Sequence, residues 1–132
     1  MILKIEGYTM FEIQIERDFA AAHYLRGYDG NCSSLHGHNW VVRVIAKSEE
    51  LDELGIALDF KALKAALDAL LDELDHKCLN DLPGFTVLNP TAEHIAKYLY
   101  DELVKTINNG VVSIDRVRIF ENAKSCATYY QS

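Results

Sequence analysis

The most informative stretch of the sequence is His36-Gly37-His38-Asn39-Trp40-Val41-Val42-Arg43-Val44-Ile45-Ala46. Its second half is rich in β-branched and aromatic side chains, which predicts a strand from about residue 38 to residue 47. Successive side chains of an extended chain alternate between its two faces, so the imidazoles of His36 and His38 point the same way. We therefore expect a pair of histidine side chains at the mouth of this strand.

The remaining periodicities predict the order strand, strand, helix, helix, strand, strand. Residues 11–16 alternate between apolar and polar side chains, and a strand-like run continues to residue 22. Asp59 and Thr91 are residue types that cap helices, and an apolar stripe at helical spacing follows each of them. Two further strands are predicted over residues 111–121 and 126–130.

This order of elements indicates a single α+β domain. A chain of 132 residues suits one domain, spanning 1–132, with one core. One sheet under two amphipathic helices buries only one of its faces, so the other face is exposed to solvent or covered by partner subunits. The edges of the sheet also invite pairing between chains, and we therefore expect a symmetric oligomer.

Composition and charge exclude several classes of protein. Hydrophobic residues make up 49% of the chain and charged residues 25%, as in soluble globular proteins. The net charge of −7 argues against nonspecific binding to nucleic acid or to anionic membranes. No apolar run approaches the ~20 residues of a membrane span, and residues 1–10 lack the apolar core of a signal peptide. The 3 cysteines lack a tight pairing pattern, so we expect reduced thiols and a cytoplasmic protein.

A metal-binding set is the strongest chemical candidate in the sequence. His23 ends the first predicted strand and joins His36 and His38 as a third imidazole. Three neutral imidazoles bind zinc and leave the fourth tetrahedral position open, which is the arrangement of catalytic zinc sites. An isolated His-x-His pattern, such as that of His36 and His38, is usually structural. The third histidine, His23, and the nearby Cys32 are the residues that favour a metal site here. Close to zinc or a histidinium, Cys32 would become a thiolate.

Three acidic and basic side chains admit two interpretations each. His76, with Asp75, ends the first predicted helix, where the helix dipole favours a histidine. Alternatively, Asp75 supports His76, and His76 exchanges a proton with Cys32 or with substrate. Glu121 lies in line with apolar positions of its strand, so it occupies either the rim of the sheet or a pocket. In a pocket it would suit a planar ligand with adjacent N–H donors, such as a pterin or a guanine edge.

The other histidine and the other cysteines carry no such signal. We expect His94 to be a surface residue without partners in the first turn of the second helix. We expect Cys78 and Cys126 to be packing residues.

Six blocks and one glutamate, spread over nearly the whole chain, carry a family resemblance. They are Phe19-Ala20-Ala21-Ala22-His23, Cys32-Ser33-Ser34-Leu35-His36-Gly37-His38-Asn39-Trp40, Leu58-Asp59-Phe60, Leu74-Asp75-His76-Lys77-Cys78-Leu79-Asn80, Asn89-Pro90-Thr91-Ala92-Glu93 and Glu121. In this order the sequence resembles the 6-pyruvoyl-tetrahydropterin synthase family. It is most similar to the bacterial branch that makes 6-carboxy-5,6,7,8-tetrahydropterin in queuosine biosynthesis, because the gap between Cys32 and His36 has the length found there.

The resemblance implies a fold and an assembly. The tunnelling fold of the family is a four-stranded antiparallel sheet with two helices on one face, in the order β-β-α-α-β-β. Its members form trimers that stack into hexamers around a β-barrel. Their active sites lie between subunits, so one site draws on more than one chain.

The resemblance also implies the role of each candidate residue. His23, His36 and His38 would bind Zn²⁺, and Cys32 would accept the proton. His76 with Asp75, and Glu121, would form the relay that tunes Cys32. Glu121 would also anchor the pterin ring.

The implied reaction converts 7,8-dihydroneopterin triphosphate to 6-carboxy-5,6,7,8-tetrahydropterin, with release of triphosphate and acetaldehyde. One alternative is a 6-pyruvoyl-tetrahydropterin synthase, which stops after triphosphate elimination. Another is an oligomeric module that binds zinc or a purine without turnover.

The sequence departs from the family pattern at two places, and the second of them concerns recognition of the substrate. Asn122 follows the glutamate where the family often has threonine. Basic residues are scarce before His36, where only Arg26 is found after His23. Triphosphate recognition would then draw on a neighbouring subunit or on residues elsewhere, of which the candidates are Arg26, Lys77, Arg116 and Arg118.

Overall fold

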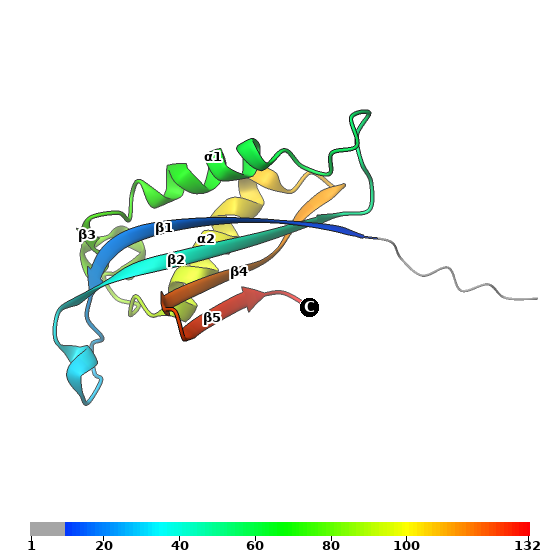
Figure 1. Cartoon of the computed structure of the whole chain (residues 1–132). Coiled ribbons are helices and arrows are strands. Elements are labelled where there is room, and N and C mark those ends of the chain that lie inside the picture. Colours follow the sequence, from blue (N-terminus) through cyan, green and yellow to red (C-terminus); the bar gives the residue numbers. More distant parts are fainter. Residues whose placement is uncertain (1–9) are drawn as a thin grey trace, which may run out of the picture.

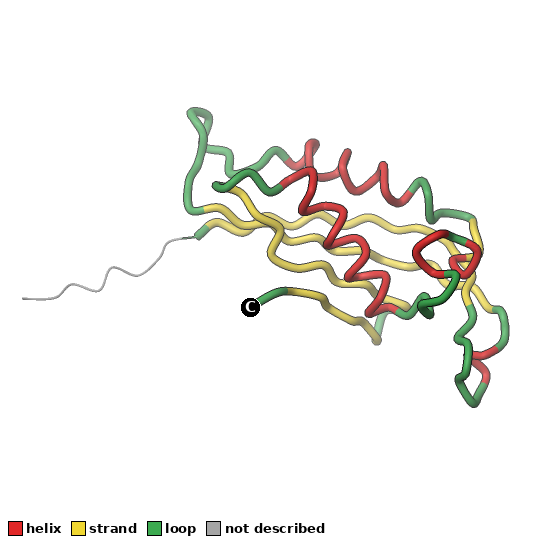
Figure 2. Tube along the Cα trace, turned by 180° about the vertical axis from the view of Figure 1, so that it is seen from behind, coloured by secondary structure: helices red, strands yellow, loops and turns green. Residues whose placement is uncertain are grey.

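A computed structural model describes residues 10–132 of the chain. Its strands and helices are β1 (Phe11–His23), β2 (His36–Ser48), α1 (Phe60–Leu71), β3 (Lys77–Cys78), α2 (Ala92–Ile107), β4 (Val112–Asn122) and β5 (Ser125–Tyr130). Both helices lie on one face of the sheet, as Figures 1 and 2 show from opposite sides. The long connection between β1 and β2 projects beyond the end of the sheet (Figure 1).

The sheet has 5 strands in the order β3-β1-β2-β4-β5. The neighbours β1-β2, β2-β4 and β4-β5 are antiparallel, whereas β3 runs parallel to β1. The α+β class and the two helices are therefore confirmed, but the predicted sheet of four antiparallel strands is one strand short. Lys77 and Cys78 pair with Ala21 and Ala22 where the chain leaves α1. A strand of 2 residues leaves no periodic pattern in the sequence, which is why it was not foreseen.

Both helices begin where the capping residues predict. The side chain of Asp59 accepts a hydrogen bond from the amide of Lys61 at 2.8 Å, and Thr91 Oγ1 accepts one from the amide of His94 at 3.1 Å. The end of α1 differs from the prediction, because this helix stops at Leu71, before Asp75 and His76. The chain then tightens into turns, in which Leu74 N–H donates to the carbonyl of Leu71 at 3.0 Å. The connection from β3 to α2 contains two short 3₁₀-helices, Leu79–Asp81 and Pro83–Phe85.

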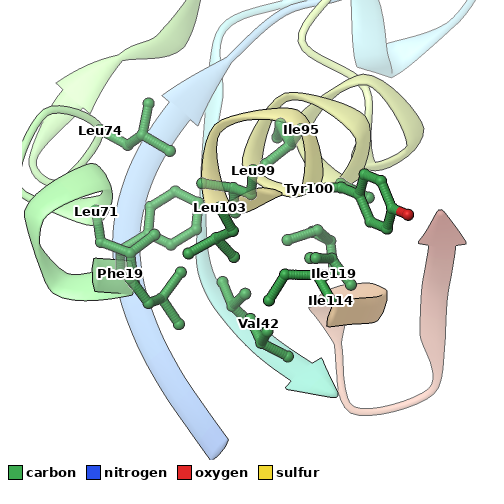
Figure 3. Packing of buried hydrophobic residues seen from close by; sticks show 14 of the residues in the cluster. Phe19, Val42, Leu71, Leu74, Ile95, Leu99, Tyr100, Leu103, Ile114 and Ile119 are labelled. Carbon is green, nitrogen blue, oxygen red and sulfur yellow. The ribbon is translucent and has the colours of Figure 1, made fainter. Parts of the chain in front are cut away.

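The core fills the space between the helices and the sheet. Figure 3 shows Val42 and Ile119 of the sheet facing Leu99 and Leu103 of α2. All four side chains are fully buried, and so is Trp40. Burial of one such aliphatic side chain contributes about 1.5–3 kcal/mol to stability. This packing fixes α2 against the strands that carry the candidate site.

The opposite face of the sheet is polar and is not covered by the helices. Glu16 and Arg43 lie across from each other on β1 and β2, and Arg43 Nε donates to Glu16 Oε1 at 2.7 Å. The guanidinium of Arg43 also lies over the ring of Phe120, 4.6 Å from its centre. Between residues 10 and 132, no helix combines the length and the apolar character that crossing a membrane requires.

Candidate metal centre and active site

The pairing of β1 with β2 brings the predicted histidines together. His23 lies opposite His36, and Ala21 lies opposite His38. Because residues that face each other across antiparallel strands share a side of the sheet, all three imidazoles point the same way. Their ring centres are 4.5 Å apart for His23 and His36, and 4.9 Å apart for His36 and His38.

Glu121 reaches this group from the neighbouring strand β4. Its Oε1 lies 3.1 Å from His38 Nε2 and 3.4 Å from His23 Nε2. One potential ligand atom from each of His23, His36, His38 and Glu121 lies within 4.8 Å of the others. The four side chains, called the metal group below, could therefore hold a metal ion.

Backbone carbonyls fix the orientation of two of the rings. Pro90 O lies 2.7 Å from His23 Nδ1, and Ser34 O lies 2.7 Å from His36 Nδ1. A carbonyl oxygen only accepts hydrogen bonds, so each Nδ1 carries the proton and donates it. In this tautomer the lone pair of electrons lies on Nε2. An imidazole nitrogen binds a metal through such a lone pair.

Electrostatics in the metal group favour a bound cation. Burial lowers the pKa of His23 because it penalises the charged ring, and it lowers the pKa of His38 in the same way, although Glu121 opposes the effect. The Nε2 atoms of both rings are buried and have no hydrogen-bond partner among the described residues. His23 Nε2, whose ring carries its proton at Nδ1, and the carboxylate oxygen of Glu121 both present lone pairs to the same space. The donor set thus fits a metal ion, which would satisfy all of these atoms at once.

Asp75 and His76 form a second fixed pair beside β1. Asp75 Oδ2 lies 2.8 Å from His76 Nδ1, and Asp75 Oδ1 accepts a hydrogen bond from the amide of Ala20 at 2.9 Å. The Ala20 amide first, and the His76 ring second, lower the pKa of the Asp75 carboxyl. His76 also adopts φ 59°, a value that non-glycine residues seldom take. Its side chain remains 81% exposed, so the ring is oriented and yet accessible.

A pocket lies beside His76, at the end of β1 and β2. It has a volume of about 520 Å³, and its lining includes His38, His76 and Lys77. Cys32 lies apart from the metal group, in a short 3₁₀-helix (Asn31–Ser33) of the projecting loop, and is half-buried. Within one chain, the structure thus brings together the three histidines and Glu121, and His76 lines a pocket to which His38 also contributes.

Sequence reasoning missed the contact of Glu121 with the histidines, although it identified each of these residues. The available signal was the position of Glu121 in line with Val117 and Ile119, because that face of β4 is the one that packs under the helices. Trp40 supports the group from beneath, with its ring centre 4.9 Å from that of His23.

The expectations for His94 and Cys126 are corrected, and Arg26, a candidate for the triphosphate, is found with partners in its own chain. His94 has partners, because Asn89 O lies 2.6 Å from its Nδ1 and its amide donates to Thr91. Cys126 is exposed on β5 rather than packed in the core. The Arg26 guanidinium donates to backbone carbonyls, those of Phe85, Asn80 and Leu88, and so is occupied within the chain.

Fold and site define an α+β protein with a group of side chains that could hold a metal ion at one end of its sheet. The family model for 6-pyruvoyl tetrahydropterin synthase matches residues 12–132, and the chain belongs to this family.

Relatives and solved structures agree with this assignment. The 6-carboxy-5,6,7,8-tetrahydropterin synthase of Synechocystis is 38% identical over 126 residues, covering 92% of this chain and 94% of the relative. The enzyme of the same name from Aquifex aeolicus is 33% identical over 121 residues, with 74% and 75% of the two chains covered. The structure of the 6-pyruvoyl tetrahydropterin synthase of Caenorhabditis elegans superimposes with a TM-score of 0.83 at 28% identity, covering 97% of this chain and all of that one. The prediction that the chain is an enzyme of the pterin synthase class is confirmed.

Proposed function

We propose that the chain is a zinc-dependent lyase that converts 7,8-dihydroneopterin triphosphate to 6-carboxy-5,6,7,8-tetrahydropterin in queuosine biosynthesis. Triphosphate and acetaldehyde are released, and a water molecule is consumed. The observation that carries the proposal is the metal group, in which two buried Nε2 atoms without hydrogen-bond partners face the Glu121 carboxylate. The names of the Synechocystis and Aquifex relatives support the choice of product.

Zinc is the metal we assign to the group. His23, His36 and His38 supply three neutral imidazoles, a donor set that zinc uses in catalytic sites with an open fourth position. When bound, the ion supplies Lewis acidity toward the oxygen atoms of the substrate side chain. Glu121, at the rim of the group, accepts hydrogen bonds from the adjacent N–H donors of the pterin ring.

Proton transfer falls to side chains outside the zinc ligands. The thiolate of Cys32 removes a proton from the substrate side chain and later returns one. His76 exchanges this proton, and its ring is held for the task by Asp75 at 2.8 Å. Its exposure in the described chain is consistent with a partner that comes from outside the chain.

We further propose that the active site is shared between subunits of a trimer, and that two trimers stack into a hexamer around a β-barrel. Cys32 lies outside the metal group of its own chain, which leaves room for a group from a neighbour. Among the described residues, β3 covers only Ala21 and Ala22 on the outer edge of β1, and β5 pairs only with β4. These edges and the uncovered sheet face are available for assembly.

Lys77 is the basic residue best placed to contact the phosphates. It lines the pocket that also contains His38 and His76. Arg26 is occupied by carbonyl oxygens, and Arg116 Nε donates to Asp115 at 2.7 Å. Arg118 has no ion pair among the described residues and remains the second candidate.

Product analysis tests the proposed reaction. The purified chain is incubated with 7,8-dihydroneopterin triphosphate, and the products are identified by mass spectrometry. We expect 6-carboxytetrahydropterin together with acetaldehyde. A 6-pyruvoyl product would instead assign the alternative synthase activity, which the Caenorhabditis neighbour carries in its name. Unchanged substrate would assign a binding module without turnover.

A further inference from the structure

The chain that follows His23 is tied to a distant segment by two asparagine side chains. Asn80 Oδ1 accepts from the amide of Tyr24 at 3.0 Å, and Asn80 Nδ2 donates to the carbonyl of Tyr24 at 2.9 Å. Asn89 repeats the pattern with Arg26, at 2.9 Å and 3.0 Å. Each asparagine side chain thus binds both the N–H and the C=O group of one backbone residue. A neighbouring β-strand would make the same two hydrogen bonds.

The guanidinium of Arg26 also binds the stretch that contains Asn80 and Asn89. It donates to the carbonyl of Phe85 at 2.9 Å and to those of Asn80 and Leu88 at 3.3 Å each. These carbonyls belong to the irregular stretch between β3 and α2, which has no ladder to satisfy them. We call Asn80, Asn89 and Arg26, with these bonds, the clamp.

The clamp lies next to both residues of the hydrogen bond between His23 Nδ1 and the carbonyl of Pro90. Tyr24, held by Asn80, follows His23 directly, and Pro90, which accepts from His23 Nδ1 at 2.7 Å, follows Asn89 directly. His23 is 2% exposed and Asn80 is 3% exposed, so water has little access to either. Polar groups in such a place must be satisfied by the protein, and their geometry is correspondingly fixed.

We propose that Asn80 and Asn89 are positioning residues for His23, because they hold the Pro90 carbonyl against Nδ1 and so aim Nε2 into the metal group. The inference rests on the proposed metal binding. It also assigns Arg26 to the clamp rather than to the phosphates of a substrate. Partners of this kind, which orient a ligand without touching the metal, typically affect metal affinity by about 10–100-fold.

Cobalt titration of the full chain separates positioning from a merely structural role. Co²⁺ is added to the metal-free protein, and binding is followed by the visible absorption of the bound ion. The test variant is Asn89→Ala, and the matched control is Asn108→Ala, which removes an amide that caps β4 by accepting from the amide of Ile114 at 2.8 Å. We expect both variants to lower the melting temperature, but only Asn89→Ala to weaken Co²⁺ affinity, by about tenfold or more.

A second, more conservative variant keeps the test informative if Asn89→Ala does not fold. Asn89→Asp keeps the acceptor for the Arg26 amide and loses the donor to its carbonyl, so we expect an affinity between those of Asn89→Ala and the unchanged chain. Unchanged Co²⁺ affinity and absorption in both Asn89 variants would overturn the positioning role alone. Failure of the unchanged chain to bind Co²⁺ would overturn the metal site and this inference with it.

Discussion

The carboxylate of Glu121 lies 3.1 Å from Nε2 of His38, although the two residues belong to different strands. Their proximity agrees with the antiparallel register of β2 with β4, in which Val41 faces Phe120, so that Glu121 continues β4 in the direction of His38. Burial lowers the pKa of His38 and so favours its neutral ring, although Glu121 opposes the effect. The metal group could hold a cation at this point, and we expect a bound ion to stabilise the arrangement.

Removal of one imidazole should release the metal. In His36→Ala the ligand set loses one of its three nitrogens, so we expect most of the zinc to be lost on dialysis. The control is His76→Ala, because His76 is exposed and outside the metal group. Elemental analysis of the purified variants measures the zinc content, and full retention of zinc in His36→Ala would show that the histidines are not the ligands.

Loss of the Cys32 thiol should reduce turnover without affecting ground-state binding. Proton transfer by a positioned side chain contributes about 10²–10⁴ in rate, so we expect a decrease of that order in Cys32→Ala. Zinc content and pterin affinity should be nearly unchanged. Cys126→Ala is the matched control, since Cys126 is an exposed thiol on β5. Steady-state kinetics decide the matter, and near-normal turnover in Cys32→Ala would contradict the proposed role of the thiolate.

Glu121→Gln should behave differently from Cys32→Ala. The amide keeps the shape of the side chain but replaces a charged acceptor with a neutral group, half of which donates. We expect weaker binding of the pterin, seen as a higher KM and a higher Kd for a non-reacting pterin, together with a smaller effect on kcat. Isothermal titration of both variants with the same pterin provides the comparison. Equal pterin affinity in Glu121→Gln and the unchanged chain would remove Glu121 from substrate recognition.

Assembly should restore activity to mixed oligomers of two inactive variants. If the site is shared between subunits, a trimer containing both Cys32→Ala and His36→Ala chains can retain a site in which both residues are intact. We expect sedimentation to give a multiple of three subunits. We also expect joint refolding of the two variants to regain part of the turnover that neither has alone. A stable, fully active monomer would exclude the shared site.

The sequence predicts the residues of the site better than it predicts their contacts. His36 and His38 share a face because side chains alternate along any strand, and this local rule holds here. The contact of Glu121 with His38 depends on the register of β2 and β4, which shifts at Ile45 and Ala46. A register shift arises from long-range packing and leaves no local pattern, so it could not be predicted.

The fold shows the same division between local and long-range effects. Asp59 and Thr91 cap the two helices as expected, because capping involves only the first turn of each helix. The parallel strand β3 and the clamp on Tyr24 and Arg26 were not foreseen. Both depend on segments that are distant in sequence and lack periodicity, and only the folded chain brings them together.

We propose that cleavage of the pterin triphosphate requires a zinc ion in the metal group. This requirement is tested by product formation in one preparation before zinc removal by a chelator, after removal, and after zinc is added back, with 6-carboxytetrahydropterin measured by mass spectrometry. We predict that product formation is lost with the zinc and returns when one equivalent per subunit, about the content expected of a catalytic site, is restored. Undiminished formation of the product by the metal-free protein would contradict the claim.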